Sequence, residues 1–134
     1  MTLGLIGLPG SGKTTVFEAL TGNFQETGHK GETRIGTVRV PDQRVDALSK
    51  IYTPKKTTYA QVEYLLPGRI QERDTGKTSS TWNAVRDCDA LIHVVRNFSG
   101  YGLNEPLALK DVSLIDEELI LADLIVVEKR IERL

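Results

Sequence analysis

The sequence predicts an α/β fold in which a mostly parallel β-sheet is flanked by helices. Two short, continuous apolar runs, at residues 3–6 and 90–95, have the length and composition of strands buried on both faces. Two other segments, 37–40 and 59–66, alternate polar and apolar residues, as half-exposed strands do. Helical patterns lie between and after these four segments, which is the order of elements expected for an α/β domain.

Three short helices are expected between the strands. The first covers residues 13–20 and ends at Gly22, since glycine at this place is a common helix stop. Asp42 can cap the second helix. The apolar face of that helix is formed by Val45, Leu48 and Ile51. A third helix is expected over residues 81–86.

The C-terminal segment predicts a long helix. Ser113 followed by Asp116 fits a capping arrangement that opens it. Its apolar residues recur at intervals of 4, 3, 4 and 3, which is the spacing of a coiled-coil seam. We call this set the seam: Ile120, Leu124, Val127, Ile131 and Leu134. We therefore expect residues 1–114 to be part of an α/β domain, and 115–134 to begin a helix that pairs with another copy or belongs to a longer protein.

Composition limits the classes of partner. A chain of 134 residues with net charge −1 predicts one compact domain without a global basic field toward nucleic acid or anionic lipid. Cys88 is the only cysteine, which rules out an internal disulfide, favours a cytoplasmic location and is expected to be a small buried hydrophobe. The apolar N-terminus is too short for a membrane span, and no membrane partner is expected.

Residues 7–14 carry the strongest motif in the chain. They read GLPGSGKT and match G-x-x-x-x-G-K-[ST] in full, between a predicted strand and a predicted helix. Glycines let the backbone fold so that its N–H groups converge on phosphate oxygens, a concavity that side chains would obstruct. The helix that follows presents the positive end of its dipole to the same charge. The motif therefore predicts a phosphate-binding loop.

Each residue type in the loop has an expected role. Lys13 can reach the outer phosphates and is the residue expected to act in any phosphoryl transfer, while the Thr14 hydroxyl can ligate Mg²⁺. Thr15 can bond an inner phosphate. The expected ligand is GTP or ATP with Mg²⁺. The predicted nucleotide-binding residues are Gly7, Pro9, Gly10, Ser11, Gly12, Lys13, Thr14 and Thr15.

Four further stretches resemble one family. They are VRVPDQRVDAL (38–48), PKKTTYAQVEYL (54–65), RDCDALIHVVRNF (86–98) and IDEELILADLIVVEKRIERL (115–134). Together they are similar, in order and over nearly the whole chain, to the YchF/Obg-like subfamily of translation-factor-related P-loop GTPases and ATPases. The resemblance implies the N-terminal part of a G domain, nucleotide binding, a coiled-coil insert, and the ribosome or RNA as partner.

The sequence departs from the family pattern in both switch regions. Leu66 stands where the family carries a switch aspartate that supports Mg²⁺, and Gly68 is the substitute expected for the glycine that donates to the γ-phosphate. The family's switch threonine falls at Lys30, so Thr33 is the nearby substitute. Because phosphoryl transfer depends on positioning and electrostatics, these changes predict nucleotide binding with slow or absent hydrolysis.

Two other functions stay open on the sequence. The loop motif also occurs in small-molecule kinases, which need a lid with arginines, and the polar segment 69–80 offers Arg69 and Arg73. Alternatively, the chain is a non-enzymatic partner module whose loop is a relic and whose seam mediates association. The base-recognition motif N-K-x-D does not occur, so the choice between GTP and ATP is open.

Other polar residues predict no separate site. Segments 25–33 and 69–80 are polar and lack periodicity, which predicts mobile loops. His93 lies within an apolar run and is expected to be a core histidine with a satisfied hydrogen bond. The pair Lys55 and Lys56, together with Arg69 and Arg73, could form a weak RNA-facing patch, although a solvated surface is the default expectation.

Overall fold

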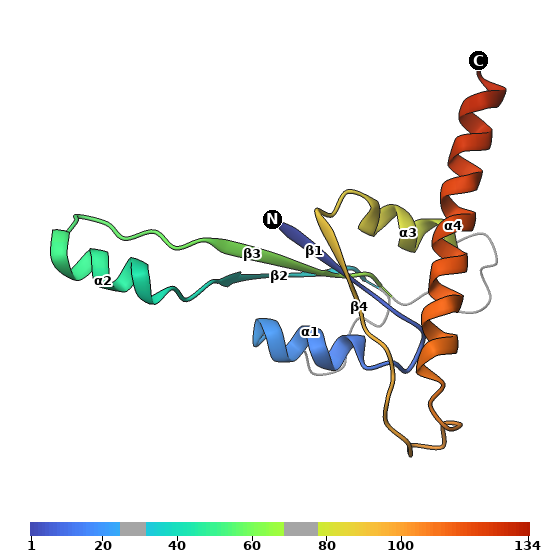
Figure 1. Ribbon diagram of the computed structural model, residues 1–134, viewed down its shortest axis with the longest axis horizontal. Coiled ribbons are helices and arrows are strands. Elements are labelled where there is room, and N and C mark those ends of the chain that lie inside the picture. Colours follow the sequence, from blue (N-terminus) through green and yellow to red (C-terminus); the bar gives the residue numbers. More distant parts are fainter. Residues whose placement is uncertain (25–31, 69–77) are drawn as a thin grey trace.

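The computed structural model describes residues 1–24, 32–68 and 78–134, without the side chains of residues 78–81 (Figure 1). Helices and strands follow one another within these ranges in the predicted order. The predicted loops 25–33 and 69–80 lie largely outside the described residues. α3 begins at Thr78, three residues before the predicted start of the third helix at residue 81. The elements are β1 (Thr2–Ile6), α1 (Lys13–Thr21), β2 (Arg34–Arg39), α2 (Gln43–Tyr52), β3 (Gln61–Leu66), α3 (Thr78–Arg86), β4 (Ala90–His93) and α4 (Ala108–Glu132).

The strands form one sheet in the order β2-β3-β1-β4. β1 pairs in parallel with both β3 and β4, and β2 pairs antiparallel with β3. The predicted, mostly parallel sheet is thereby confirmed. One detail is wrong: β4 is not buried on both faces, because Ala90 is exposed and Leu91 is 41% exposed. An apolar run alone does not reveal whether other elements cover both faces of a strand.

Two apolar clusters hold helices on opposite faces of the sheet. Leu5 packs with Phe17 of α1 and with Leu66 at the end of β3. Its neighbour Ile6 points the other way, because successive side chains of a strand alternate between faces. Ile6 packs with residues of α3 and α4, near the end of the sheet that α4 crosses in Figure 1. These residues are Trp82, Val85 and Ile115.

The long C-terminal helix is confirmed, but its predicted start is wrong. α4 begins at Ala108 after Leu107, which makes no side-chain cap. Ser113 lies inside the helix, and its hydroxyl donates to the Leu109 carbonyl at 3.1 Å. A serine can bond the carbonyl four residues earlier as readily as it can cap a helix, so the local pattern did not identify the helix start.

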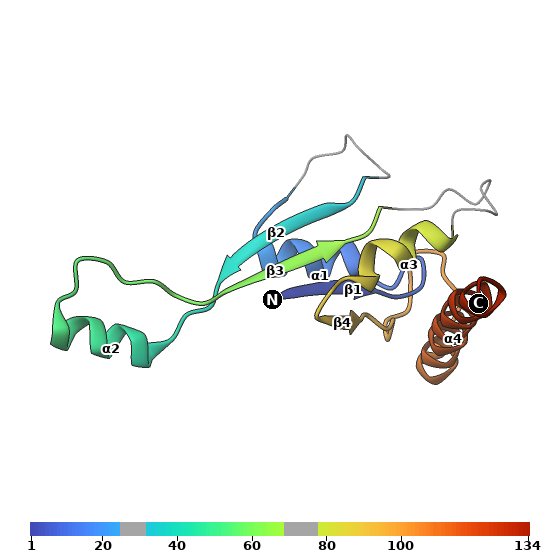
Figure 2. The ribbon, with the colours of Figure 1, turned by 90° about the horizontal axis from the view of Figure 1, so that it is seen from above.

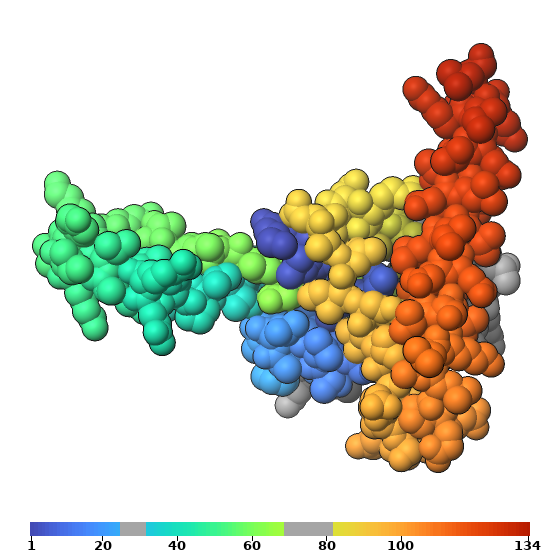
Figure 3. All heavy atoms as spheres, in the orientation of Figure 1, coloured from blue at the N-terminus to red at the C-terminus, as the bar shows by residue number. Residues whose placement is uncertain are grey.

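Residues 40–60, which we call the arm, extend away from the sheet (Figures 1 and 3). Asp42 caps α2 as predicted, accepting from the Arg44 amide at 2.9 Å. Its hydrogen bonds with Arg44 lower the pKa of the Asp42 carboxyl to about 2, so the cap stays charged throughout the neutral range. No residue of α2 is buried, and Leu48 and Ile51 of its apolar face are 54% and 71% exposed.

The buried core and the exposed arm predict different losses of stability when an aliphatic side chain is removed. Leu5→Ala leaves a cavity against Phe17 and should lower the free energy of unfolding by about 2–5 kcal/mol. Ile51→Ala, in the arm, should change it by no more than about 0.5 kcal/mol. Urea unfolding followed by circular dichroism measures both variants, and equal destabilisation would contradict the assigned core.

Candidate functional site

Glycines shape the loop that joins β1 to α1. Gly7 has φ +148°, and a Cβ built on it would lie 2.4 Å from the Val94 carbonyl oxygen and 2.9 Å from Ser11 Oγ. Gly12 immediately precedes α1 in the left-handed region, at φ 95°. A side chain at either position would meet the neighbouring backbone or force a strained conformation. The sequence therefore permits a tight turn that exposes main-chain atoms.

The N-terminus of α1 supplies N–H donors at this loop. Val16 N donates to Gly12 O at 3.0 Å, the first bond within the helix. The amides before Val16 have no carbonyl one turn earlier within the helix. No side chain caps this end, and its first turn carries no acidic residue. The N-terminal end of α1 is therefore a positive region of the kind that binds phosphate.

Lys13 brings a cation to the same loop. Its ammonium group donates to the carbonyls of Gly7 at 2.7 Å and Leu8 at 2.8 Å, and its side chain is half-buried. The ammonium is therefore held across the start of the loop. Thr14 is half-buried and Thr15 exposed, both in the first turn of α1.

Ser11 has a structural position in the loop. Its amide donates to Leu8 O at 3.2 Å, which closes a turn within the loop. The side chain is only 5% exposed, and Ser11 Oγ has no hydrogen-bond partner within the described residues. By contrast, Pro9 and Gly10 are exposed. The loop thus has Ser11 on its inner side and Pro9 and Gly10 on its outer side.

The topology brings both switch candidates to the edge that carries the loop. β3 runs parallel to β1, with Leu65 beside Gly4, so both strands end at one edge of the sheet. β2 is antiparallel and begins there, because Arg34 pairs with Leu66. Thr33, which is exposed, directly precedes β2, and the half-buried Gly68 follows β3. Lys30, the position of the family threonine, lies outside the described residues.

Leu66 is a core residue in this structure. It is 6% exposed and packs with Leu5 and Phe17 on the α1 side of the sheet.

No group of three or more His, Cys, Asp or Glu side chains that could hold a metal occurs within residues 1–24, 32–68 and 78–134. The residues present fit a polyphosphate well. For Mg²⁺ they offer the Thr14 hydroxyl, and a bound nucleotide would have to supply further oxygen ligands.

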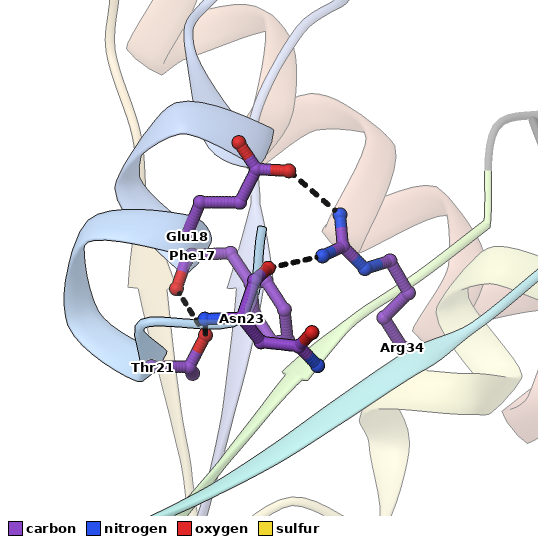
Figure 4. Close-up of polar contacts among 5 residues, drawn as sticks. All are labelled: Phe17, Glu18, Thr21, Asn23 and Arg34. Carbon is purple, nitrogen blue, oxygen red and sulfur yellow. Dashed lines mark hydrogen bonds and ion pairs between the residues drawn. The ribbon is translucent and has the colours of Figure 1, made fainter. Parts of the chain in front are cut away.

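A polar cluster beside the site was missed in the sequence (Figure 4). Arg34 donates to Glu18 Oε1 at 3.0 Å and to the Asn23 carbonyl at 2.5 Å, and its guanidinium lies 4.9 Å from the centre of the Phe17 ring. Thr21 Oγ1 donates to the Phe17 carbonyl and accepts from Asn23 N. The cluster ties the start of β2 to the end of α1. Arg34 and Glu18 are 16 positions apart, a spacing that no local pattern marks.

Two expectations about single residues have different outcomes. His93 was expected to have a satisfied hydrogen bond, but its Nε2 atom is buried without a partner in the described part of the chain, so this prediction is wrong. Burial raises the pKa of the Cys88 thiol, with smaller contributions from Asp87 and Asp89. Cys88 is therefore a protonated thiol at neutral pH, and it packs against the core cluster around Ile6, but it is half-buried rather than buried as predicted.

Comparison with known proteins gives consistent matches. Residues 2–129 match the family model described as 50S ribosome-binding GTPase. Proteins named ribosome-binding ATPase YchF are similar to the chain: 34% identical in Bacillus subtilis over 99% of the chain, and 39% identical in Buchnera aphidicola subsp. Schizaphis graminum over 98%. The relative from Escherichia coli O157:H7 is 31% identical over 97% of the chain. The chain spans 39% of the length of each of these relatives.

A separate test concerns membranes. Across the described ranges of the chain, none of the helices combines the length and the apolar character needed to cross a bilayer.

The close approach at Gly7 predicts the effect of a single methyl group. Gly7→Ala would place Cβ against the Val94 carbonyl, so the loop must move and the thermal midpoint should fall by several degrees. Gly102→Ala is the matched control, since Gly102 also has a positive φ, of +70°, but no atom lies within 4 Å of its built Cβ. Differential scanning calorimetry compares the two, and a larger loss for Gly102→Ala would contradict the assigned role of close packing.

Proposed function

Since the chain belongs to the 50S ribosome-binding GTPase family, and its resemblance to YchF/Obg-like P-loop proteins is confirmed, we propose that it is a nucleotide-dependent switch of the cytoplasm. The proposed ligand is GTP or ATP with Mg²⁺. One observation carries the proposal: the uncapped N-terminus of α1 lies directly behind a tight loop whose turn depends on Gly7 and Gly12.

Each residue near the loop has a proposed role. The amides at the start of α1 bind phosphate oxygens, and Lys13 turns from the loop carbonyls toward the outer phosphates. The Thr14 hydroxyl would hold Mg²⁺, which neutralises charge between the phosphates when it is bound. Ser11 supports the loop from within, while Thr15 reaches an inner phosphate. Thr33 and Gly68 approach the outer phosphate from the same edge of the sheet.

Hydrolysis is proposed to be slow or absent. Leu66 occupies the position of the family's switch aspartate, and its burial with Leu5 and Phe17 leaves an apolar side chain there. Phosphoryl transfer needs preorganised charge around the metal and the transferred group. A leucine supplies none, so the site is better suited to holding a triphosphate than to cleaving it.

The proposed macromolecular partner is the ribosome. The relatives are named ribosome-binding, and they match the chain from the phosphate loop into α4. The chain covers only part of their length, so the activity of such a longer protein comes to this chain as a proposal. The small-molecule kinase alternative gains no support, because Arg69 and Arg73 lie outside the described residues.

Pairing through α4 is a second proposal, favoured by the exposure of the seam. Its five residues are between 47% and 95% exposed. Leu124 is nine residues from the buried Ile115, about two and a half helical turns, so the two face opposite ways. The side of α4 that packs on the domain is therefore not the seam. We propose that residues 1–114 form the G-domain part and 115–134 begin a coiled-coil helix.

Lys13 gives the most direct test of nucleotide binding. Lys13→Ala removes charge-assisted hydrogen bonds and should weaken binding of non-hydrolysable ATP and GTP analogues by about 10- to 100-fold. Isothermal titration calorimetry, with and without Mg²⁺, measures the effect. Lys110→Ala, on the exposed start of α4, should bind like the unmodified chain.

Thr14 separates metal from phosphate. Thr14→Ala should lose most of the gain in affinity that Mg²⁺ gives, while Thr14→Ser keeps a hydroxyl and should retain it.

Because Lys13 also bonds loop carbonyls, melting curves must show that Lys13→Ala is folded. Unchanged affinity in a folded Lys13→Ala variant would sink the proposed site.

The seam can be tested by two neighbouring substitutions of similar exposure. Leu124 is 47% and Ile125 50% exposed, but only Leu124 belongs to the seam. Leu124→Glu would bury a charge in the pair and should weaken self-association by about 10-fold or more, whereas Ile125→Glu should change it little. Sedimentation equilibrium measures both, and an unmodified chain that stays monomeric at high concentration would contradict pairing with a second copy.

A further inference from the structure

The arm (residues 40–60) keeps a defined shape without an apolar core of its own. Tyr59 donates from its hydroxyl to Asp46, and the hydroxyls of Ser49 and Thr57 lie 2.7 Å apart. These bonds join α2 to the segment that returns toward β3. Val40 N donates to Ala60 O at 2.8 Å at the base of the arm. Polar bonds therefore fix an element whose helix buries no residue.

The end of the arm, residues 50–56, is called the tip. It contains Lys50, Lys55 and Lys56, all exposed, and no acidic residue. None of the three lysines forms an ion pair within the described part of the chain. Three exposed lysines thus fall within seven consecutive residues of a chain whose net charge is −1.

The acidic residues of the arm are both engaged away from the tip. Asp42 pairs with Arg44 at 2.8 Å, and Asp46 accepts from Tyr59. Their bonds brace the helix start and the returning segment. Asp46 lies one turn before Lys50 on α2, but no ion pair joins either carboxylate to a tip lysine within the described residues. Lys55 and Lys56, beyond the helix, are exposed to solvent.

An aromatic side chain accompanies these lysines. Tyr52 is 75% exposed, and Ile51 beside it is 71% exposed. Thr53 ends α2 in the left-handed region, at φ 41°, and its amide donates to Ser49 O at 3.0 Å. This closed turn, which leads into Pro54, fixes where the chain leaves the helix. Tyr52 is thus presented from a folded turn rather than from a free end.

We propose that the tip binds unpaired RNA, with the lysines on phosphates and the Tyr52 ring stacked on a base; the inference rests on the proposed ribosome partner. Lysines select a polyanion, and a free aromatic face adds stacking that an unpaired base can use. Sequence-specific and stacking contacts to RNA are made mainly where bases are unpaired. An acidic protein would use the same charges but would give the tyrosine face no base to stack on.

The tip lies far from the phosphate loop along the sheet. β2 begins at the edge that carries the loop, and its other end, Arg39, leads into the arm. Figures 1 and 2 show α2 at one end of the molecule and α4 at the other. RNA binding at the tip and nucleotide binding at the loop can therefore be removed one at a time.

Fluorescence anisotropy with a labelled 20-nucleotide oligouridine tests the proposal over a range of salt concentrations. Replacing Lys50, Lys55 and Lys56 together by Gln should weaken binding at least about 10-fold at low salt. It should also reduce the slope of log affinity against log salt by about 2, since each single-strand phosphate contact contributes about 0.7. Tyr52→Ala should weaken binding about 5-fold or more with the slope unchanged.

A triple variant in α4, Lys110→Gln, Lys129→Gln and Arg130→Gln, is the matched control because it changes net charge equally. It should bind oligouridine like the unmodified chain, and equal weakening would show a net-charge effect and overturn the assignment. Polyglutamate that competes as well as unlabelled oligouridine would assign the tip to an acidic protein and also overturn it. Calorimetric titration with nucleotide keeps the two hypotheses apart, because the tip variants should retain nucleotide binding and Lys13→Ala should retain RNA binding.

Discussion

The contact between Gly7 and the Val94 carbonyl is the constraint on which the site depends. It brings the end of β1 against the segment that follows β4, so closely that no side chain fits between them. The chain must therefore turn at once, and α1 begins only six residues later with its amide end beside the loop. The packing of Leu5 on Phe17 fixes the direction of that helix. The loop proposed to bind phosphate is thus shaped by sheet pairing and core packing, and Lys13 and Thr14 are the side chains it offers to the proposed ligand.

The same edge of the sheet carries the residues on which the proposed separation of binding from cleavage depends. Antiparallel β2 and parallel β3 bring Thr33 and Gly68 to the loop, and Arg34 ties the base of β2 to α1 through Glu18 and the Asn23 carbonyl. Both proposed switch residues thus lie at the edge of the sheet that carries the loop. At the end of β3, however, Leu66 packs in the core with Leu5 and Phe17, so this position offers an apolar side chain and no carboxylate.

The sequence predicted what is local and periodic. β1, α1, α2 with its Asp42 cap, and the glycine-rich loop between β1 and α1 all have signals within a few residues, and each was found in the structure. Features that depend on distant partners were missed: the edge position of β4, the missing partner of His93 Nε2, and the Arg34–Glu18 pair. The start of α4 was also missed. Ser113 was predicted to cap the helix, but it lies inside the helix, where its hydroxyl donates to the Leu109 carbonyl. The exposure of α2 in the arm could not be predicted from its sequence either, because it depends on whether another element packs against the apolar face of the helix.

Nuclear magnetic resonance of the backbone amides tests the central claim most directly. Titration with a non-hydrolysable triphosphate analogue and Mg²⁺ should shift the resonances of Gly12, Lys13, Thr14 and Thr15 strongly, because their N–H groups would gain charged acceptors. Resonances of Lys50 and Tyr52 in the tip should stay in place. Shifts confined to other parts of the chain, or no shifts at saturating nucleotide, would contradict the account.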